Sequence, residues 1–134
     1  MKRLIAIIAA MLPFLGAVAQ DLDAEYAVDL LRPGVQAPDF TLNDISGKPV
    51  TLSGFRGRQV VLVFWASWCP DCRAEVPQLK ALQAQANPEK VAFVSVSFDR
   101  TLEALQTYVN ENYLPGVQLF DPAGKKESKV ADAF

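Results

Sequence analysis

The chain has 134 residues, of which 51% are hydrophobic and 21% charged, a composition typical of one globular domain rather than a disordered chain. Its formal net charge is −2, and no stretch concentrates basic residues as nucleic-acid binding requires, so we expect no nucleic-acid partner. The sequence contains no histidine, which excludes zinc sites that need histidine, haem attachment through Cys-x-x-Cys-His and Cys-His nucleophilic catalysis.

The first 19 residues have the three parts of a secretory signal peptide. They are a basic start at Lys2 and Arg3, an apolar stretch over residues 4–15, and small residues just before a cleavage point. The uncharged run is shorter than the roughly 20 apolar residues that a membrane-spanning helix needs. We therefore predict cleavage after Ala19 and an exported protein, periplasmic or secreted, without stable membrane insertion after cleavage.

Residues 20–33 show no clear period, and we expect them to form a lead-in to a single domain over residues 34–134. Between residues 36 and 52, apolar and polar side chains alternate on both sides of the turn sequence Asp44-Ile45-Ser46-Gly47-Lys48. This pattern predicts a small β-hairpin at the start of the domain.

The run from Val60 to Ala66 is continuous, apolar and rich in β-branched residues, which is typical of a strand buried on both faces. We expect this strand at the centre of a parallel sheet covered by helices. From Cys72 onward, apolar residues recur every three or four positions until Asn87-Pro88, which predicts a helix. The cysteines therefore lie at the junction between this predicted strand and this predicted helix.

The remaining elements alternate in the same way and complete an α/β domain with a parallel strand pair. The predicted elements are a strand over 91–98, a helix over 101–113, a short strand over 117–120, and a helix from residue 125 onward.

Cys69 and Cys72 are the only two cysteines of the chain. A structural disulfide stabilises mainly by closing a long loop, and a bridge across two residues closes almost none. Two thiols at a helix start can instead cycle between dithiol and disulfide with little backbone movement. The unpaired N–H groups and the positive dipole end there favour a thiolate on Cys69, so Cys69 is the predicted nucleophile and Cys72 the resolving thiol.

The two residues between the cysteines limit how reactive this thiolate becomes. Pro70 suits the first position of a helix, where a backbone N–H has no partner in any case. Asp71 places a carboxylate beside the sulfurs and opposes thiolate formation. We therefore predict a moderate nucleophile with the redox poise of a reductase or isomerase, not of a strong oxidant.

The stretch from Val60 to Pro77, with the core sequence Trp68-Cys69-Pro70-Asp71-Cys72-Arg73-Ala74-Glu75, resembles the active-site region of the TlpA/ResA-type thioredoxin-like (redoxin) proteins. Gly34 and the segment Ala37-Pro38-Asp39-Phe40 resemble the lead-in of the same group. The resemblance implies an α/β thioredoxin-like fold, in which helices flank a central mixed sheet that starts with the hairpin. It also implies a thiol-disulfide oxidoreductase that uses no cofactor, exchanges with protein disulfides or dithiols, and takes electrons from an upstream dithiol donor.

The resemblance further implies roles for individual residues. Cys69 matches the nucleophile, Cys72 the resolving cysteine, and Trp68 the aromatic residue that flanks the site. Glu75 matches a glutamate that tunes the ionisation of the cysteines, although a solvated carboxylate complementing the helix dipole remains an alternative for this position. Pro77 matches a proline that kinks the helix.

Members of this group continue beyond the position of Phe134 with a loop bearing a cis-proline that faces the dithiol, followed by further strands and a helix. We therefore expect a domain that is truncated at its C-terminus and whose sheet lacks its last strands.

Four other interpretations of the dithiol stay open. They are an inert structural pair, a zinc site shared between two chains, a redox-inactive binding module of the same fold, and a peroxiredoxin-type peroxidase. The last of these is disfavoured because residues 64–69 lack the proline and threonine of the Pro-x-x-x-Thr-x-x-Cys pattern.

Overall fold

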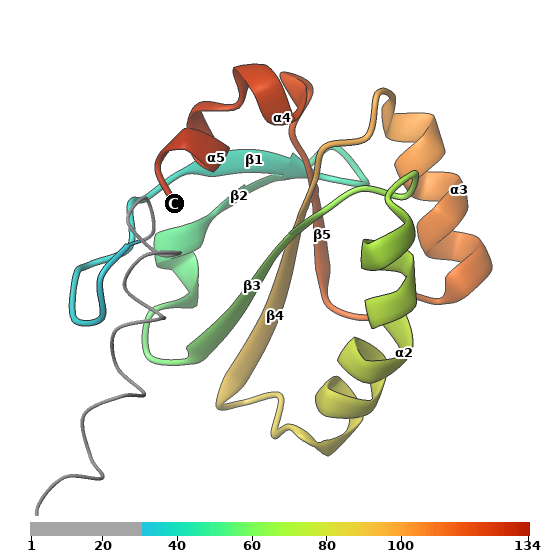
Figure 1. Cartoon of the computed structure of the whole chain (residues 1–134). Helices are drawn as coiled ribbons and strands as arrows, with labels where there is room; N and C mark the ends of the chain where they lie inside the picture. Colours follow the sequence, from blue (N-terminus) through green and yellow to red (C-terminus); the bar gives the residue numbers. More distant parts are fainter. Residues whose placement is uncertain (1–30) are drawn as a thin grey trace, which may run out of the picture. The chain divides into compact units, whose positions relative to one another are not determined.

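The computed structural model describes residues 31–134, so the predicted signal peptide over 1–19 and most of the lead-in over 20–33 lie outside the described residues. Residues 31–35 form a turn in which the Val35 N–H donates to the Arg32 carbonyl over 3.1 Å. The segment from Gln36 to Phe134 forms a separate compact unit, built around one five-stranded sheet (Figure 1). No helix in the described range has the length and apolar character needed to cross a membrane.

The elements follow one another as the alternation of the sequence predicts. They are β1 (Thr41–Asp44), β2 (Pro49–Thr51), the short 3₁₀ helix η1 (Leu52–Phe55), β3 (Gln59–Trp65), α2 (Pro70–Gln85), β4 (Val91–Ser97), α3 (Leu102–Asn112), β5 (Val117–Phe120), α4 (Gly124–Glu127) and α5 (Lys129–Asp132).

The sheet has the strand order β2-β1-β5-β4-β3 and is mixed. The strand β4 pairs in parallel with both β3 and β5, whereas β1 runs antiparallel to β2 and to β5. The predicted N-terminal β-hairpin and the predicted parallel strand pair are therefore both confirmed. Because β3 and β4 are parallel, their C-terminal ends, which precede Ala66 and Phe98, lie at the same edge of the sheet.

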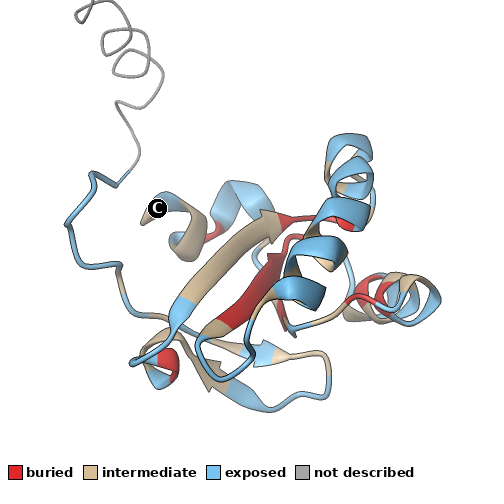
Figure 2. Cartoon of the chain, turned by 90° about the horizontal axis from the view of Figure 1, so that it is seen from below, coloured by how far each residue is buried: buried red, intermediate tan, exposed pale blue. Residues whose placement is uncertain are grey.

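The two faces of the sheet are covered by different elements. Helices α2 and α3 pack on one face through Val76, Leu105 and Val109, which gather around Trp65. On the other face, Phe55 of η1 and Ala131 of α5 pack against alternate residues of β4. The strand β4 is buried at six of its seven positions and is the red strand in Figure 2.

The predicted central position of β3 is wrong for the described residues. This strand lies at the end of the sheet, and most of its residues are half-buried rather than buried. Side chains of β3 do contact both apolar clusters, with Val63 on the side of α2 and Leu62 on the other. The continuous apolar run correctly indicated that both faces of β3 pack against apolar side chains. A side-chain pattern does not show, however, whether the backbone of a strand pairs with a neighbouring strand on both sides.

The predicted helix from Lys125 onward consists of two short helices, α4 and α5, that meet at Ser128. The Ser128 hydroxyl accepts the backbone N–H of Ala131 over 2.9 Å and so caps α5. It also donates to the buried carboxylate of Asp121 over 2.5 Å. Serine favours such a capping position over a helix interior, because its side chain competes for backbone hydrogen bonds.

Candidate active site

The two cysteines lie at the junction of β3 and α2, as predicted. The chain leaves β3 through a tight turn in which the Cys69 N–H donates to the Ala66 carbonyl over 3.1 Å. Cys69 is the N-cap residue of α2 and has extended backbone angles, while Pro70 occupies the first helical position. Pro70 therefore removes no helical hydrogen bond, which agrees with its predicted position.

The Cys69 thiol takes the place that a serine or aspartate oxygen holds at other helix starts. Its Sγ accepts the backbone N–H of Cys72 at 3.3 Å. The pKa of Cys69 is lowered, first by the hydrogen bond from the Cys72 thiol and then by this backbone N–H, while burial and the charge of Asp71 oppose the shift. Both the favoured thiolate on Cys69 and the opposing effect of Asp71 agree with the predictions.

Cys72 lies one turn further along α2 and has a different environment. It is packed at the edge of the apolar cluster formed by Trp65, Val76 and Leu105. The pKa of Cys72 is raised, mainly because burial disfavours the charged thiolate and next because its thiol donates to Cys69. The two sulfurs therefore differ in ionisation although only two residues separate them, and neither is in a disulfide.

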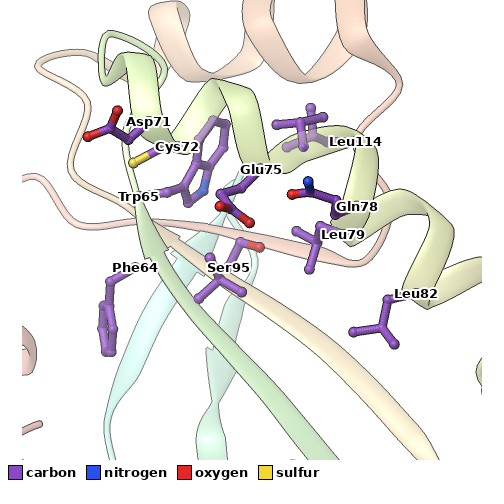
Figure 3. A pocket seen from close by; sticks show the side chains of 12 residues that line it. Phe64, Trp65, Asp71, Cys72, Glu75, Gln78, Leu79, Leu82, Ser95 and Leu114 are labelled. Atoms are coloured by element: carbon purple, nitrogen blue, oxygen red, sulfur yellow. The ribbon is translucent and has the colours of Figure 1, made fainter.

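A cavity of about 560 Å³ lies beside Cys72, between α2 and the strands β3 and β4. Its walls are mainly apolar, with contributions from Val63, Leu79 and Leu114. Figure 3 shows the Glu75 carboxylate directed into this cavity, on the side that faces Ser95 of β4. Glu75 and Cys72 thus lie along the same cavity, although the Glu75 side chain is also open to solvent.

The two tryptophans near the dithiol have opposite exposures. Trp65 is 5% exposed and belongs to the core, as predicted, and its ring lies 5.5 Å from the Tyr108 ring. Trp68 is 59% exposed and precedes Cys69 directly. An apolar side chain this exposed, directly beside the Cys69 residue, is suited to contact a partner molecule.

The other residues considered near the dithiol, Arg73, Pro77, Phe55 and Phe64, make packing contacts or belong to the helix. The guanidinium group of Arg73 lies 5.7 Å from the centre of the Tyr108 ring. Helix α2 continues through Pro77, whose ring leaves the Arg73 carbonyl without its usual helical donor. Phe55 is buried, and Phe64 is half-buried and stacks on Phe98 with 5.9 Å between ring centres.

A buried carboxylate behind the dithiol turn was missed by the sequence analysis. Asp99 is 2% exposed and accepts hydrogen bonds from the backbone N–H and the hydroxyl of Ser67, two residues before Cys69. A signal was present, because Asp99 directly follows the apolar strand 91–98, and polar residues at the C-terminal ends of parallel strands gather at one sheet edge. Within residues 31–134, no group of three or more metal-ligating side chains comes together.

Comparison with known families gives a match over most of the chain. The sequence pattern of the AhpC/TSA family matches residues 33–134. The thiol-disulfide oxidoreductase ResA of Oceanobacillus iheyensis is 35% identical over 109 residues, which cover 78% of this chain and 55% of that protein. The chain spans 39% to 73% of the length of the first curated relatives it matches. The predicted resemblance to ResA-type redoxin proteins is confirmed.

Solved structures agree on the fold. The thioredoxin domain of the thiol-disulfide oxidoreductase BVU-2223 from Bacteroides vulgatus superposes with a TM-score of 0.69 at 28% identity, covering 77% of this chain and 73% of that one. A secreted disulfide oxidoreductase of Mycobacterium tuberculosis gives a TM-score of 0.55 at 34% identity, covering 61% of this chain and 60% of that one. The predicted thioredoxin-like α/β fold is confirmed.

Proposed function

The chain belongs to the AhpC/TSA family, and from this premise we propose that it is a thiol-disulfide oxidoreductase of the TlpA/ResA type that acts through Cys69 and Cys72. One observation carries the proposal. The Cys69 sulfur caps a helix and accepts an N–H, whereas the Cys72 sulfur is packed against an apolar cluster. This asymmetry is what sequential attack and resolution require.

The reaction proceeds in two exchanges. The Cys69 thiolate attacks one sulfur of a substrate disulfide, so that a mixed disulfide forms and the other substrate sulfur leaves as a thiolate. Cys72 then loses its proton and attacks the Cys69 sulfur, which releases the substrate as a dithiol and leaves a Cys69–Cys72 disulfide. An upstream dithiol donor returns two electrons and two protons and restores the reduced protein.

We assign supporting roles to Glu75 and Trp68. Glu75 tunes the ionisation of Cys72 from the cavity that both residues line, at the step where the Cys72 thiol must lose its proton. Trp68 provides an exposed apolar surface against which a substrate polypeptide packs while Cys69 attacks.

The proposed direction of electron flow is reduction of the substrate. A strongly lowered pKa of the attacking thiol stabilises the reduced form and makes a protein an oxidant, as in DsbA with a potential of about −120 mV. Asp71 counteracts that effect at Cys69. A titration of the dithiol against glutathione tests this point, and we expect a potential well below that of DsbA; a value near it would exclude the reductase assignment.

The proposed location is outside the cytoplasm, in the periplasm or an equivalent exported space. The N-terminal sequence has the pattern of a signal peptide, and a relative of 34% identity is described as secreted. Expression of the full chain with a C-terminal tag, followed by cell fractionation and mass spectrometry of the mature N-terminus, tests this. Cytoplasmic recovery of the uncleaved chain would contradict it.

The activity itself is tested by reduction of insulin disulfides in the presence of dithiothreitol. We expect the wild-type chain to accelerate precipitation of the insulin B chain, and Cys69→Ser to reduce this acceleration at least about a hundredfold. Thermal melting of both proteins controls for folding. Equal rates for the two proteins would remove the enzymatic assignment, and consumption of hydroperoxide by the wild type alone would favour the peroxidase alternative.

A further inference from the structure

Two buried aspartates follow neighbouring parallel strands. Asp99 comes after β4 and is 2% exposed, and Asp121 comes after β5 and is 4% exposed. Each carboxylate accepts a serine hydroxyl and a backbone N–H. A buried carboxylate is costly unless hydrogen bonds satisfy it, so both networks contribute to holding the fold together.

The two networks hold different segments. The Asp121 carboxylate accepts the Ala123 N–H at 3.0 Å and the Ser128 hydroxyl at 2.5 Å, and therefore binds the segment that leads into α4 and α5. Both hydrogen-bond partners of this carboxylate, Ala123 and Ser128, follow β5 in the sequence. Asp121 is accordingly a structural residue of the C-terminal helices.

Asp99 instead joins β4 to the turn that carries the dithiol. Its Oδ1 accepts the Ser67 hydroxyl at 2.6 Å and the Ser67 N–H at 3.1 Å. Its Oδ2 accepts the Ser97 hydroxyl at 2.7 Å, and that hydroxyl in turn accepts the Asp99 N–H at 3.0 Å. One carboxylate oxygen thus bonds to Ser97 of β4, and the other bonds to Ser67 of the turn.

Ser67 occupies the second position of the turn that the Cys69 N–H closes on the Ala66 carbonyl. The residues that follow it are Trp68 and Cys69, so the direction of this turn fixes where the exposed indole and the nucleophilic sulfur point. Asp99 restrains this turn through two groups of Ser67, the backbone N–H and the hydroxyl.

We propose that Asp99 is a positioning residue for the dithiol, because its carboxylate fixes Ser67 and thereby the orientation of Trp68 and Cys69 toward a substrate disulfide. Attack on a disulfide needs the sulfur to approach along the S–S axis, and small misplacements of a reacting atom cost rate steeply. The part of this inference that concerns substrates rests on the proposed oxidoreductase function.

The test compares Asp99→Ala with Asp121→Ala in the full chain. We expect both substitutions to lower the melting temperature, since each leaves buried donors without an acceptor. At a temperature well below both transitions, we expect Asp99→Ala to lower kcat/KM for insulin reduction about tenfold, and Asp121→Ala to change it less than about twofold. Equal kcat/KM for the two variants would overturn the proposal.

Ser67→Ala is a second, milder variant that keeps the Asp99 side chain and serves as the test if Asp99→Ala does not fold. It deletes only the 2.6 Å hydroxyl bond, and we expect kcat/KM to fall about threefold. If Asp99 acts through Ser67, the double variant loses no more than Asp99→Ala alone. Fully additive losses, or an unchanged Ser67→Ala, would contradict the proposal.

A readout that needs no protein substrate separates this inference from the proposed function. The rate at which iodoacetamide alkylates Cys69 reports the presentation of the sulfur in the folded protein, whatever the substrate is. We expect Asp99→Ala and Ser67→Ala to change this rate at least about threefold, and Asp121→Ala to leave it unchanged. An inactive wild type would refute the proposed function, whereas identical alkylation in all four proteins would refute the positioning role of Asp99.

Discussion

Cys69 and Cys72 show how one turn of helix separates two chemically identical side chains. The Cys69 sulfur lies at the start of α2, accepts the Cys72 N–H at 3.3 Å, and has a lowered pKa. The Cys72 sulfur is packed against the cluster around Val76 and Leu105, and burial raises its pKa. In the proposed mechanism, position along the helix, rather than a different residue type, therefore distinguishes the attacking sulfur from the resolving sulfur.

The lowered pKa of Cys69 supports a proposed first step in which Cys69 attacks as a thiolate. A helix start offers N–H donors that have no carbonyl partner, and Cys69 takes one of them. The thiolate is thus stabilised before substrate arrives. The proposed second step is more demanding, because Cys72 must lose a proton in apolar surroundings. Cys72 lies along the cavity into which the Glu75 carboxylate is directed (Figure 3).

The largest expected effect comes from Cys72→Ser. Without the resolving thiol, Cys69 still attacks but the reaction stops at the mixed disulfide, so multiple turnover is lost. Mass spectrometry under non-reducing conditions will detect a covalent adduct of Cys72→Ser with insulin chains and none for Cys69→Ser. Adducts of equal yield in the two variants would show that the sulfurs are interchangeable.

A smaller effect is expected for Glu75→Gln. If the carboxylate assists the ionisation of Cys72, resolution of the mixed disulfide slows about tenfold while the first attack by Cys69 is unchanged. Stopped-flow measurement with a fluorescent disulfide substrate separates the two phases. Gln78→Ala, which alters the same cavity without changing a titratable group, is the matched control. An unchanged second phase would make Glu75 a solvated carboxylate of the helix start.

The smallest expected effect belongs to Asp71→Asn. The negative charge of Asp71 raises the pKa of Cys69 against the other contributions, so its removal lowers that pKa further. We expect about twofold faster alkylation of Cys69 at neutral pH and a potential about 10 mV less negative.

Glu89→Gln serves as the control for Asp71→Asn, because it removes the same charge beyond the far end of α2, on the order of 20 Å away. Equal changes of alkylation rate and potential in the two variants would show that Asp71 acts only through the net charge of the protein.

Much of the fold could be predicted because its signals are local. The switch from a β-branched run before Ala66 to a three-to-four-residue period after Cys72 located β3 and α2 to within a few residues. The position of β3 at the end of the sheet could not be predicted, since face burial and edge pairing are independent. The break of the last helix at Ser128 depended on a distant carboxylate, Asp121, which no local pattern reveals.

The features of the site also divide into those with a local signal in the sequence and those that depend on tertiary contacts. The spacing of the cysteines and the helix start predicted the lowered pKa of Cys69 from neighbours in sequence. The raised pKa of Cys72 depends on burial at the apolar cluster around Trp65, Val76 and Leu105, and the contact of Asp99 with Ser67 spans 32 positions. Both therefore required the tertiary structure, although an aspartate directly after a buried parallel strand was a usable hint.

The most direct test of the account is the pH dependence of alkylation at each cysteine, measured by mass spectrometry on the reduced wild-type protein. Because the pKa of Cys69 is lowered and that of Cys72 raised, Cys69 should react first and its rate should rise at a lower pH than that of Cys72. Equal reactivity at the two positions, or earlier modification of Cys72, would contradict the division of roles between the two sulfurs.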